Sequence, residues 1–221
     1  MTRPPYGPRS PVPGPLVIGH RGFAARHTDN SLTGVRAALA AGADGVEVDV
    51  RPCADGTWVC HHDRSRDGRP VRTWTRAALR RQGVCSLEEV LEAMPAGRWL
   101  FVEVKPLERA ELARLGEALA GLLRQAAARI RLLSSSLPVL EALGGELDVP
   151  RSWVIDELPE QVPAALELSP HHLLVERLAG WERPLHPWTV NRPERMRQLA
   201  ALGIASITSN RPDLACEVLR G

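Results

Sequence analysis

The sequence predicts an α/β protein whose parallel strands, each followed by a helix, close into a single compact barrel. From residue 16 onward, short β-type runs alternate with amphipathic helical stretches, an order typical of right-handed βαβ units and a parallel sheet. The runs number about eight, as a closed (β/α)8 barrel requires. The 221 residues suit one mid-sized domain. An open, doubly wound sheet is the alternative, although its nucleotide-binding versions need a glycine-rich loop that is missing after the first strand.

The composition excludes several classes of protein. Hydrophobic residues make up 44% of the chain and charged residues 24%, which is ordinary for a globular protein with a buried core. The net charge of +2 is too balanced to indicate nucleic-acid binding. No apolar run is long enough to form a transmembrane segment.

The first fifteen residues differ from the rest of the chain. They contain six prolines and no apolar stretch of the kind found in signal peptides. We therefore expect residues 1–15 to form a disordered tail, residues 16–221 to form the barrel, and the protein to be cytoplasmic.

In the first half, apolar runs and helix signals follow one another closely. Ser86 with a glutamate three residues later is a capping signature for the helix that follows. The expected strands are residues 16–20, 45–50, 57–63 and 98–105, and the expected helices are 31–42, 86–95 and 108–126.

The second half repeats this alternation with weaker signals. The expected strands are 129–136, 152–157, 171–177, 186–190 and 204–209, and the expected helices are 138–143, 159–168 and 193–203.

Unusual polar residues stand where the first strands end, which is where catalytic residues collect in a parallel barrel. Two acids, Glu47 and Asp49, share one strand face while valines cover the other. The remaining polar residues at strand ends are His20, Arg21, His62, Glu103 and Lys105.

The three acids predict a metal site. Strands of a parallel sheet are covered on both faces, so carboxylates gathered there lose hydration and repel one another unless a cation compensates. Glu47, Asp49 and Glu103 offer the oxygen ligands that Mg²⁺ or Ca²⁺ prefers, whereas Lys105 alone can neutralise only one of them. The alternative is that they are solvent-facing acids on amphipathic strands.

Two histidines beside such a site are suited to displacement at phosphorus. One of the two histidines, His20 or His62, can take a proton from the attacking oxygen while the other gives a proton to the leaving oxygen. Arg21 and Lys105 can balance the charge on the phosphoryl oxygens. Each histidine alone could instead be a hydrogen-bonded structural residue.

At this level of detail the chain resembles the glycerophosphodiester phosphodiesterase family, whose fold is a TIM barrel. The resemblance covers nearly all of residues 16–221. The motifs that carry it are His20-Arg21-Gly22, GADGVEVDV (42–50), DGTWV with His62-Asp63, Glu103-Val104-Lys105, LLSSS, WTVN (188–191) and SITSNRPD.

The resemblance implies metal-dependent hydrolysis of small-molecule glycerophosphodiesters to sn-glycerol 3-phosphate and an alcohol. It implies that His20 and His62 are the acid/base pair, that Glu47, Asp49 and Glu103 are metal ligands, and that Arg21 and Lys105 bind phosphate. Trp188 is expected to line the mouth of the site, with core packing as the alternative. The sequence leaves three points open: which histidine is the acid, which alcohol is released and which oligomer forms.

The chain departs from the family pattern in two places. Where the family usually has Pro-Glu-Asn-Thr, residues 28–31 read Thr-Asp-Asn-Ser. Asp29 either contacts the metal or substrate with its shorter side chain or serves in the N-cap region of the first helix. The stretch between His62 and Glu103 is shorter than the family's insertion after the second strand, a segment that often shapes the substrate mouth.

Three other functions are compatible with parts of this pattern. A phospholipase D-type lyase would use the same site and release a cyclic phosphate. A non-catalytic barrel that binds phosphorylated ligands would have lost some of these residues, and all are present. A metal-dependent aldolase or isomerase would need no histidine pair.

Overall fold

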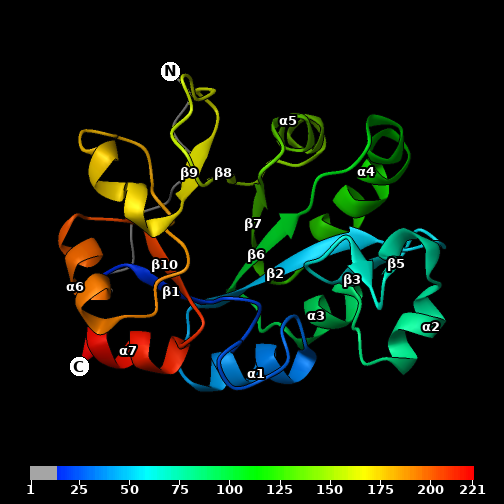
Figure 1. The fold of residues 1–221 in the computed structure, drawn as a ribbon, viewed down its shortest axis with the longest axis horizontal. Helices are drawn as coiled ribbons and strands as arrows, with labels where there is room; N and C mark the ends of the chain where they lie inside the picture. The colour runs from blue at the N-terminus through cyan, green and yellow to red at the C-terminus, as the bar shows by residue number, and fades with distance from the viewer. Residues whose placement is uncertain (1–13) are drawn as a thin grey trace.

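Parallel strands form the centre of the molecule, and helices cover their outer side (Figure 1). The structure is a computed structural model that describes residues 14–221. In order of pairing, the parallel strands are β10 (Ser206–Ser209), β1 (Leu16–Gly19), β2 (Gly45–Pro52), β6 (Trp99–Val104), β7 (Arg129–Ser134), β8 (Arg151–Ile155) and β9 (Glu167–Pro170). The first and last strands of the chain are thus neighbours, drawn in blue and orange-red in Figure 1.

An extended segment, residues 185–190, fills the position between β9 and β10. On one side the backbone N–H of His186 donates to the carbonyl of Leu168 over 2.9 Å, and on the other the N–H of Thr208 donates to Pro187 over 3.0 Å. Prolines within and before the segment lack an N–H, which interrupts the ladder. The segment completes eight parallel positions, so the expected (β/α)8 barrel is confirmed.

α-Helices follow six of the eight parallel positions and pack against the outward-facing side chains. They are α1 (Leu32–Ala40), α3 (Leu87–Ala93), α4 (Arg109–Arg124), α5 (Leu137–Glu146), α6 (Pro193–Ala201) and α7 (Pro212–Arg220). The valines at positions 46, 48 and 50 of β2 are fully buried in this outer core, while the alternate residues of β2 face the barrel interior. The capping box predicted at Ser86 and Glu89 is present at the start of α3.

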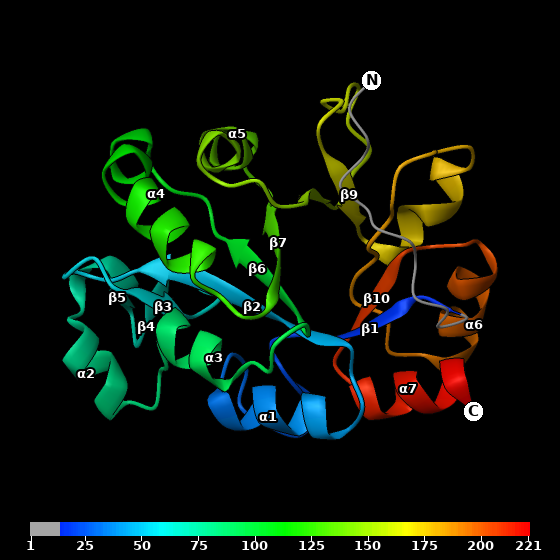
Figure 2. The ribbon, with the colours of Figure 1, turned by 180° about the vertical axis from the view of Figure 1, so that it is seen from behind.

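A small insertion follows β2 and lies to one side of the barrel, beyond the end of β2 (Figures 1 and 2). It consists of β3 (Trp58–Cys60), which pairs antiparallel with β2, a hairpin of β4 (Ser65–Arg66) and β5 (Arg69–Pro70), a 3₁₀ turn η1 (Val71–Thr73) and α2 (Arg76–Arg81). Its own core joins Val59, Val71 and Leu79. The insertion also carries His62, between β3 and β4.

Two predicted elements of the second half are wrong. The expected helix at 159–168 is an irregular loop that runs into β9, where Ser152 of β8 pairs with Glu167. The expected strand at 171–177 is a 3₁₀ helix, η2 (His172–Leu178). Leu174 and Val175 are both buried while Leu173 is 65% exposed, a pattern that a helical turn allows and a strand does not.

The predicted disordered tail, residues 1–15, lies outside the described residues except for its last two positions. Within residues 14–221, none of the helices has the length and apolar character needed to cross a bilayer.

Candidate active site

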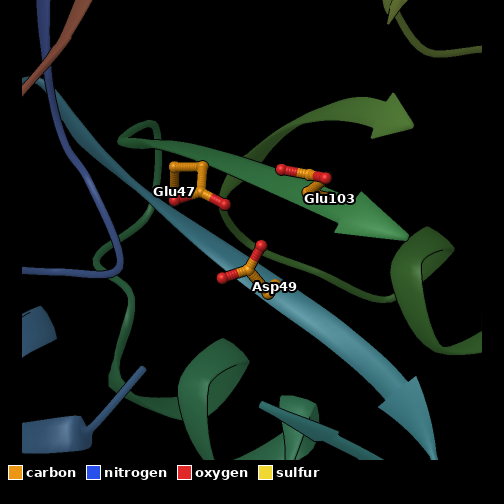
Figure 3. Close-up of side chains that lie close together, drawn as sticks. All are labelled: Glu47, Asp49 and Glu103. Atoms are coloured by element: carbon orange, nitrogen blue, oxygen red, sulfur yellow. The ribbon is translucent and has the colours of Figure 1, made fainter. Parts of the chain in front are cut away.

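Three carboxylates converge at one edge of the barrel interior. Glu47 and Asp49 lie two residues apart on β2, and Asp49 pairs in register with Glu103 of the neighbouring strand β6. Figure 3 shows the three carboxyl groups pointing toward one another. One oxygen from each lies within 4.8 Å of the others, close enough for all three to share one cation.

Two basic side chains neutralise part of this cluster. The Nζ atom of Lys105 lies 2.7 Å from Asp49 Oδ1 and 2.5 Å from Glu103 Oε1. The Nε atom of Arg21 lies 3.2 Å from the other oxygen of Asp49. Burial raises the pKa of the Asp49 carboxyl, but Lys105, Asn30 and Arg21 outweigh it and lower the pKa overall. Asp49 is therefore the carboxylate of the cluster whose charge is best compensated.

Glu47 is the least compensated of the three acids. It is 3% exposed; Oε2 accepts a hydrogen bond of 2.9 Å from the backbone N–H of Arg21, and Oε1 has no hydrogen-bond partner among the described residues. Burial, Asp49 and Glu103 raise the pKa of Glu47 well above its usual value. A divalent cation would satisfy both the unpartnered oxygen and the excess negative charge. The residues at this site thus fit a metal ion.

Asn30 supports Asp49 from the loop that precedes α1. Its Nδ2 donates to Asp49 Oδ2 over 2.9 Å, and its Oδ1 accepts from the Asp49 backbone N–H over 2.9 Å. The backbone of Asn30 has φ +58°, a left-handed conformation that asparagine adopts more readily than most residues. This pair of hydrogen bonds fixes one carboxylate in place.

His20 directly follows β1, and a hydrogen bond to Asn210 holds its ring. Its Nδ1 lies 2.6 Å from the side-chain oxygen of Asn210, and its Nε2 lies 4.0 Å from Glu47 Oε2. Burial and the charge of Arg21 lower the pKa of His20 below its usual value. The Nδ1–H donates to Asn210, so Nε2 of the neutral ring is free to accept a proton inside the barrel.

His62 follows β3 and is more open to solvent. Its Nδ1 lies 2.8 Å from Asp63 Oδ1, and its side chain is 41% exposed. As with His20, one ring nitrogen is held by an oxygen atom, which leaves Nε2 for a reacting group.

A cavity of about 160 Å³ brings most of the predicted site residues together. One part of its lining is polar and comes from His20, Arg21, Glu47, His62, Glu103 and Lys105. The remaining part combines apolar side chains with hydroxyl groups, from Leu133, Val154, Ser169, Trp188, Thr189 and Thr208. Trp188 therefore lines the cavity, and its Nε1 donates to the carbonyl of Ser169 over 2.8 Å. Asp49 lies just behind this lining, buried beneath Lys105 and Arg21.

Asp29 does not cap the first helix. The N-cap of α1 is Ser31, whose hydroxyl accepts from the backbone N–H of Gly34. The Oδ2 atom of Asp29 instead pairs with Arg21 Nη1 at 2.8 Å, at a position where the Asp29 side chain is 45% exposed. The capping alternative is thus wrong for Asp29 itself, which holds the guanidinium group at the edge of the cavity.

Two asparagines that complete the site were not singled out in the sequence. Asn30 holds Asp49, and Asn210 holds His20 and is itself held by Asn191, which accepts from the Asn210 backbone N–H. The only signal for Asn30 is an asparagine directly before the N-cap serine. Nothing in the local pattern links Asn210 to residue 20, because the contact spans the whole barrel.

Comparison with known proteins finds similarity to glycerophosphodiester phosphodiesterases. The model of the glycerophosphoryl diester phosphodiesterase family matches residues 20–132. A Mycobacterium tuberculosis protein described as "Probable glycerophosphodiester phosphodiesterase 1" is 48% identical over 65 residues, which are 29% of this chain and 22% of that protein. The match therefore spans only about a fifth of that relative's length. A second protein of that species, described as "Probable glycerophosphodiester phosphodiesterase 2", is 26% identical across 93% of this chain and 91% of its own length.

Solved structures share the fold at low sequence identity. A glycerophosphodiester phosphodiesterase of Thermotoga maritima is 22% identical with a TM-score of 0.78, covering 92% of this chain and 98% of that one. A phosphodiesterase of Oleispira antarctica, solved in complex with the product sn-glycerol-3-phosphate, is 20% identical with a TM-score of 0.80 over 93% of this chain and 96% of that one.

Proposed function

This chain belongs to the glycerophosphoryl diester phosphodiesterase family, and from that premise we propose that it hydrolyses glycerophosphodiesters to sn-glycerol 3-phosphate and an alcohol. The observation that carries the proposal is a single cavity lined by two histidines, an arginine, a lysine and two of three clustered carboxylates. The product-bound structure of the Oleispira phosphodiesterase supports a product of this size and chemistry.

The two histidines supply the proton transfers of the proposed reaction. Water attacks phosphorus, the bond between phosphorus and the leaving alcohol breaks, one histidine takes the proton of the water and the other protonates the alcohol. The lowered pKa of His20 keeps its ring neutral near neutral pH, which suits a group that accepts a proton. Asn210 and Asp63 orient the two rings.

Arg21 and Lys105 are proposed to bind the phosphoryl oxygens. Burial lowers the pKa of Lys105, but Glu103 and Asp49 outweigh it and raise the pKa, so the ammonium group stays charged. Arg21 is fixed between Asp29 and Asp49. Its planar guanidinium group is therefore held at the edge of the cavity and loses little conformational entropy when it binds phosphate.

Glu47, Asp49 and Glu103 are the residues that would hold a divalent cation, Mg²⁺ or Ca²⁺. When bound, such a cation supplies Lewis-acid stabilisation of charge on the phosphoryl group. The apolar and hydroxyl-bearing part of the cavity lining, from Val154, Ser169 and Trp188, suits the carbon backbone and hydroxyls of glycerol.

The proposal is tested with a panel of glycerophosphocholine, -ethanolamine, -inositol, -glycerol and lysophospholipids, assayed with and without EDTA. We expect release of sn-glycerol 3-phosphate from at least one diester and loss of turnover after metal removal. Phosphorus NMR of the products distinguishes hydrolysis from release of a cyclic phosphate, which would mean that a substrate hydroxyl attacks instead of water.

A matched pair of variants links the metal to the carboxylates. Glu47→Gln keeps the shape of the side chain but removes its charge, so we expect weaker cation binding by calorimetry and a loss of turnover of about 10²-fold or more. Glu141→Gln, an exposed position on α5, should behave as wild type. Full activity of the EDTA-treated enzyme would refute the metal part of the proposal.

A further inference from the structure

A second hollow lies next to the catalytic cavity, between the insertion and the start of α4. Its volume is about 300 Å³, which exceeds that of the catalytic cavity. Its lining comes from the end of β2, the β4–β5 hairpin with η1, and residues 106–111 after β6. Three arginines, Arg51, Arg64 and Arg72, are part of it, and we call this hollow the arginine cleft.

The arginine cleft adjoins the catalytic cavity through two links. Arg51 lies on the same face of β2 as Glu47 and Asp49, two residues closer to the end of the strand. Its Nε donates over 2.9 Å to the carbonyl of His62, a residue that lines the catalytic cavity. Directly after β6, Lys105 lines the cavity and the next residue, Pro106, lines the cleft. A molecule that emerges from the cavity beside His62 and Lys105 therefore meets the cleft.

The charges of the cleft favour an anion. The side chains of Arg64 and Arg72 are exposed and have no hydrogen-bond or ion-pair partner within residues 14–221. Two acids, Glu108 and Glu111, also line the cleft, so its three arginines leave one net positive charge. Guanidinium groups with free donors bind phosphate and carboxylate through paired hydrogen bonds.

We propose that the arginine cleft binds a second anionic group, a phosphate or carboxylate, carried by the alcohol part of the substrate. This inference rests on the proposed function, because it assigns the cleft to the leaving-group side of the diester. The catalytic cavity is small, so the glycerol phosphate part fills it while the alcohol extends past His62 toward Arg51. The enzyme then prefers diesters whose alcohol is itself phosphorylated or carboxylated over those whose alcohol is neutral or cationic.

Two substrates that differ by one group provide the test, glycerophosphoinositol and glycerophosphoinositol 4-phosphate. The quantity measured is the ratio of their kcat/KM values. In wild type we expect the ratio to favour the phosphorylated diester. In the double variant Arg64→Gln, Arg72→Gln it should fall by about 10- to 100-fold, the range for losing hydrogen bonds to a charged group.

Further variants separate local charge from general effects. Arg197→Gln, on α6 and outside the lining of the cleft, removes one positive charge elsewhere and should leave the ratio at its wild-type value. Arg64→Glu, Arg72→Glu should shift preference toward the cationic alcohol of glycerophosphocholine. Thermal melting by circular dichroism checks that each variant is folded.

The outcomes distinguish the cleft from the catalytic proposal. If wild type hydrolyses both inositol diesters and the ratio is the same in the double variant, the cleft does not bind the alcohol and the inference is overturned. If no glycerophosphodiester is hydrolysed by wild type, the proposed function itself fails. A ratio that falls equally in Arg197→Gln would also overturn the inference, because the effect would then be one of overall charge.

Discussion

The two histidines of the site differ in the chemistry of their hydrogen-bond partners and in their burial. His20 is buried against the amide oxygen of Asn210, while His62 is partly exposed beside the carboxylate of Asp63. The leaving alcohol is proposed to extend past His62 toward the arginine cleft. We therefore propose that His62 protonates this alcohol and that His20, whose pKa is lowered by burial and by Arg21, takes the proton of the water.

This division of labour predicts how the two alanine variants respond to the leaving group. Each general acid or base contributes about 10²–10⁴-fold, so His20→Ala and His62→Ala should both be severely impaired with a natural diester. The p-nitrophenyl ester of glycerol phosphate needs little protonation of its leaving group. It should restore much of the rate of His62→Ala and little of the rate of His20→Ala, measured as kcat/KM.

Other patterns of rescue would contradict this assignment. Preferential rescue of His20→Ala would exchange the two roles. Equal rescue of both variants, or of neither, would refute a fixed division, and a near-wild-type rate in either variant would remove that histidine from the mechanism.

At the scale of elements, β2 shows why part of the site can be predicted. Its valines alternate with Glu47, Asp49 and Arg51, so the sequence itself tells which face is buried against helices and which carries the acids. The same alternation on β6 places Glu103 and Lys105. Local periodicity therefore predicts the half of the site that two adjacent long strands provide.

β9 shows where sequence periodicity fails. Residues 164–168 read Ala-Ala-Leu-Glu-Leu, which has helical propensity, yet Glu167 belongs to a short strand. Its side chain turns into the barrel and pairs with Arg131 of β7. A contact between residues 36 positions apart decides the structure here, so tertiary pairing outweighs local propensity.

Glu167 is the centre of a buried network that joins the second half of the barrel. Its Oε2 lies 3.0 Å from His186 Nε2 and 3.3 Å from the Ser152 hydroxyl, and it forms an ion pair with Arg131. His186 Nδ1 in turn lies 2.7 Å from the Ser206 hydroxyl. Side chains from β7, β8, β9, residues 185–190 and β10 are thus linked in the interior.

Removing the carboxylate should destabilise the barrel. Glu167→Ala removes the carboxylate that pairs with Arg131, which is 3% exposed, and breaking a buried ion pair costs about 3–5 kcal/mol. Urea unfolding monitored by tryptophan fluorescence measures the free energy of unfolding. Glu176→Ala breaks an ion pair with Arg195 in which the glutamate is 53% exposed, and its cost should be below about 1 kcal/mol. Equal effects of the two changes would show that burial of the network does not determine its contribution.

At the scale of the whole molecule, barrel closure assembles the site from both ends of the chain. His20 and Asn210 are 190 residues apart in sequence and 2.6 Å apart in space. Such contacts leave no trace in local pattern, which is why the strand-end acids could be predicted from the residues and Asn30 and Asn210 could not. Closure also buries titratable groups such as His186 in the interior, and their burial makes the stability depend on pH.

His186 gives this response a defined sign. The groups that face its ring are Arg131, Glu167, Ser206 and Phe101. Burial, and secondarily the charge of Arg131, lower the pKa of His186 well below its usual value. In the unfolded chain the histidine has a pKa of about 6.5 and binds a proton that the folded protein does not. The free energy of unfolding therefore falls as the pH drops below about 6.5.

We expect His186→Gln to remove this part of the pH dependence, because glutamine is neutral and can still hydrogen-bond Glu167. One proton taken up only by the unfolded chain lowers the free energy of unfolding by about 1.4 kcal/mol between pH 7.5 and pH 5.5. The loss over that interval, measured by urea titration, should be smaller in His186→Gln than in wild type by this amount. If the two proteins lost equal free energy, His186 would have to be protonated in the fold as readily as in the unfolded chain. The interior network would then hold an imidazolium ring between Glu167 and Ser206, and Arg131 would not govern its charge.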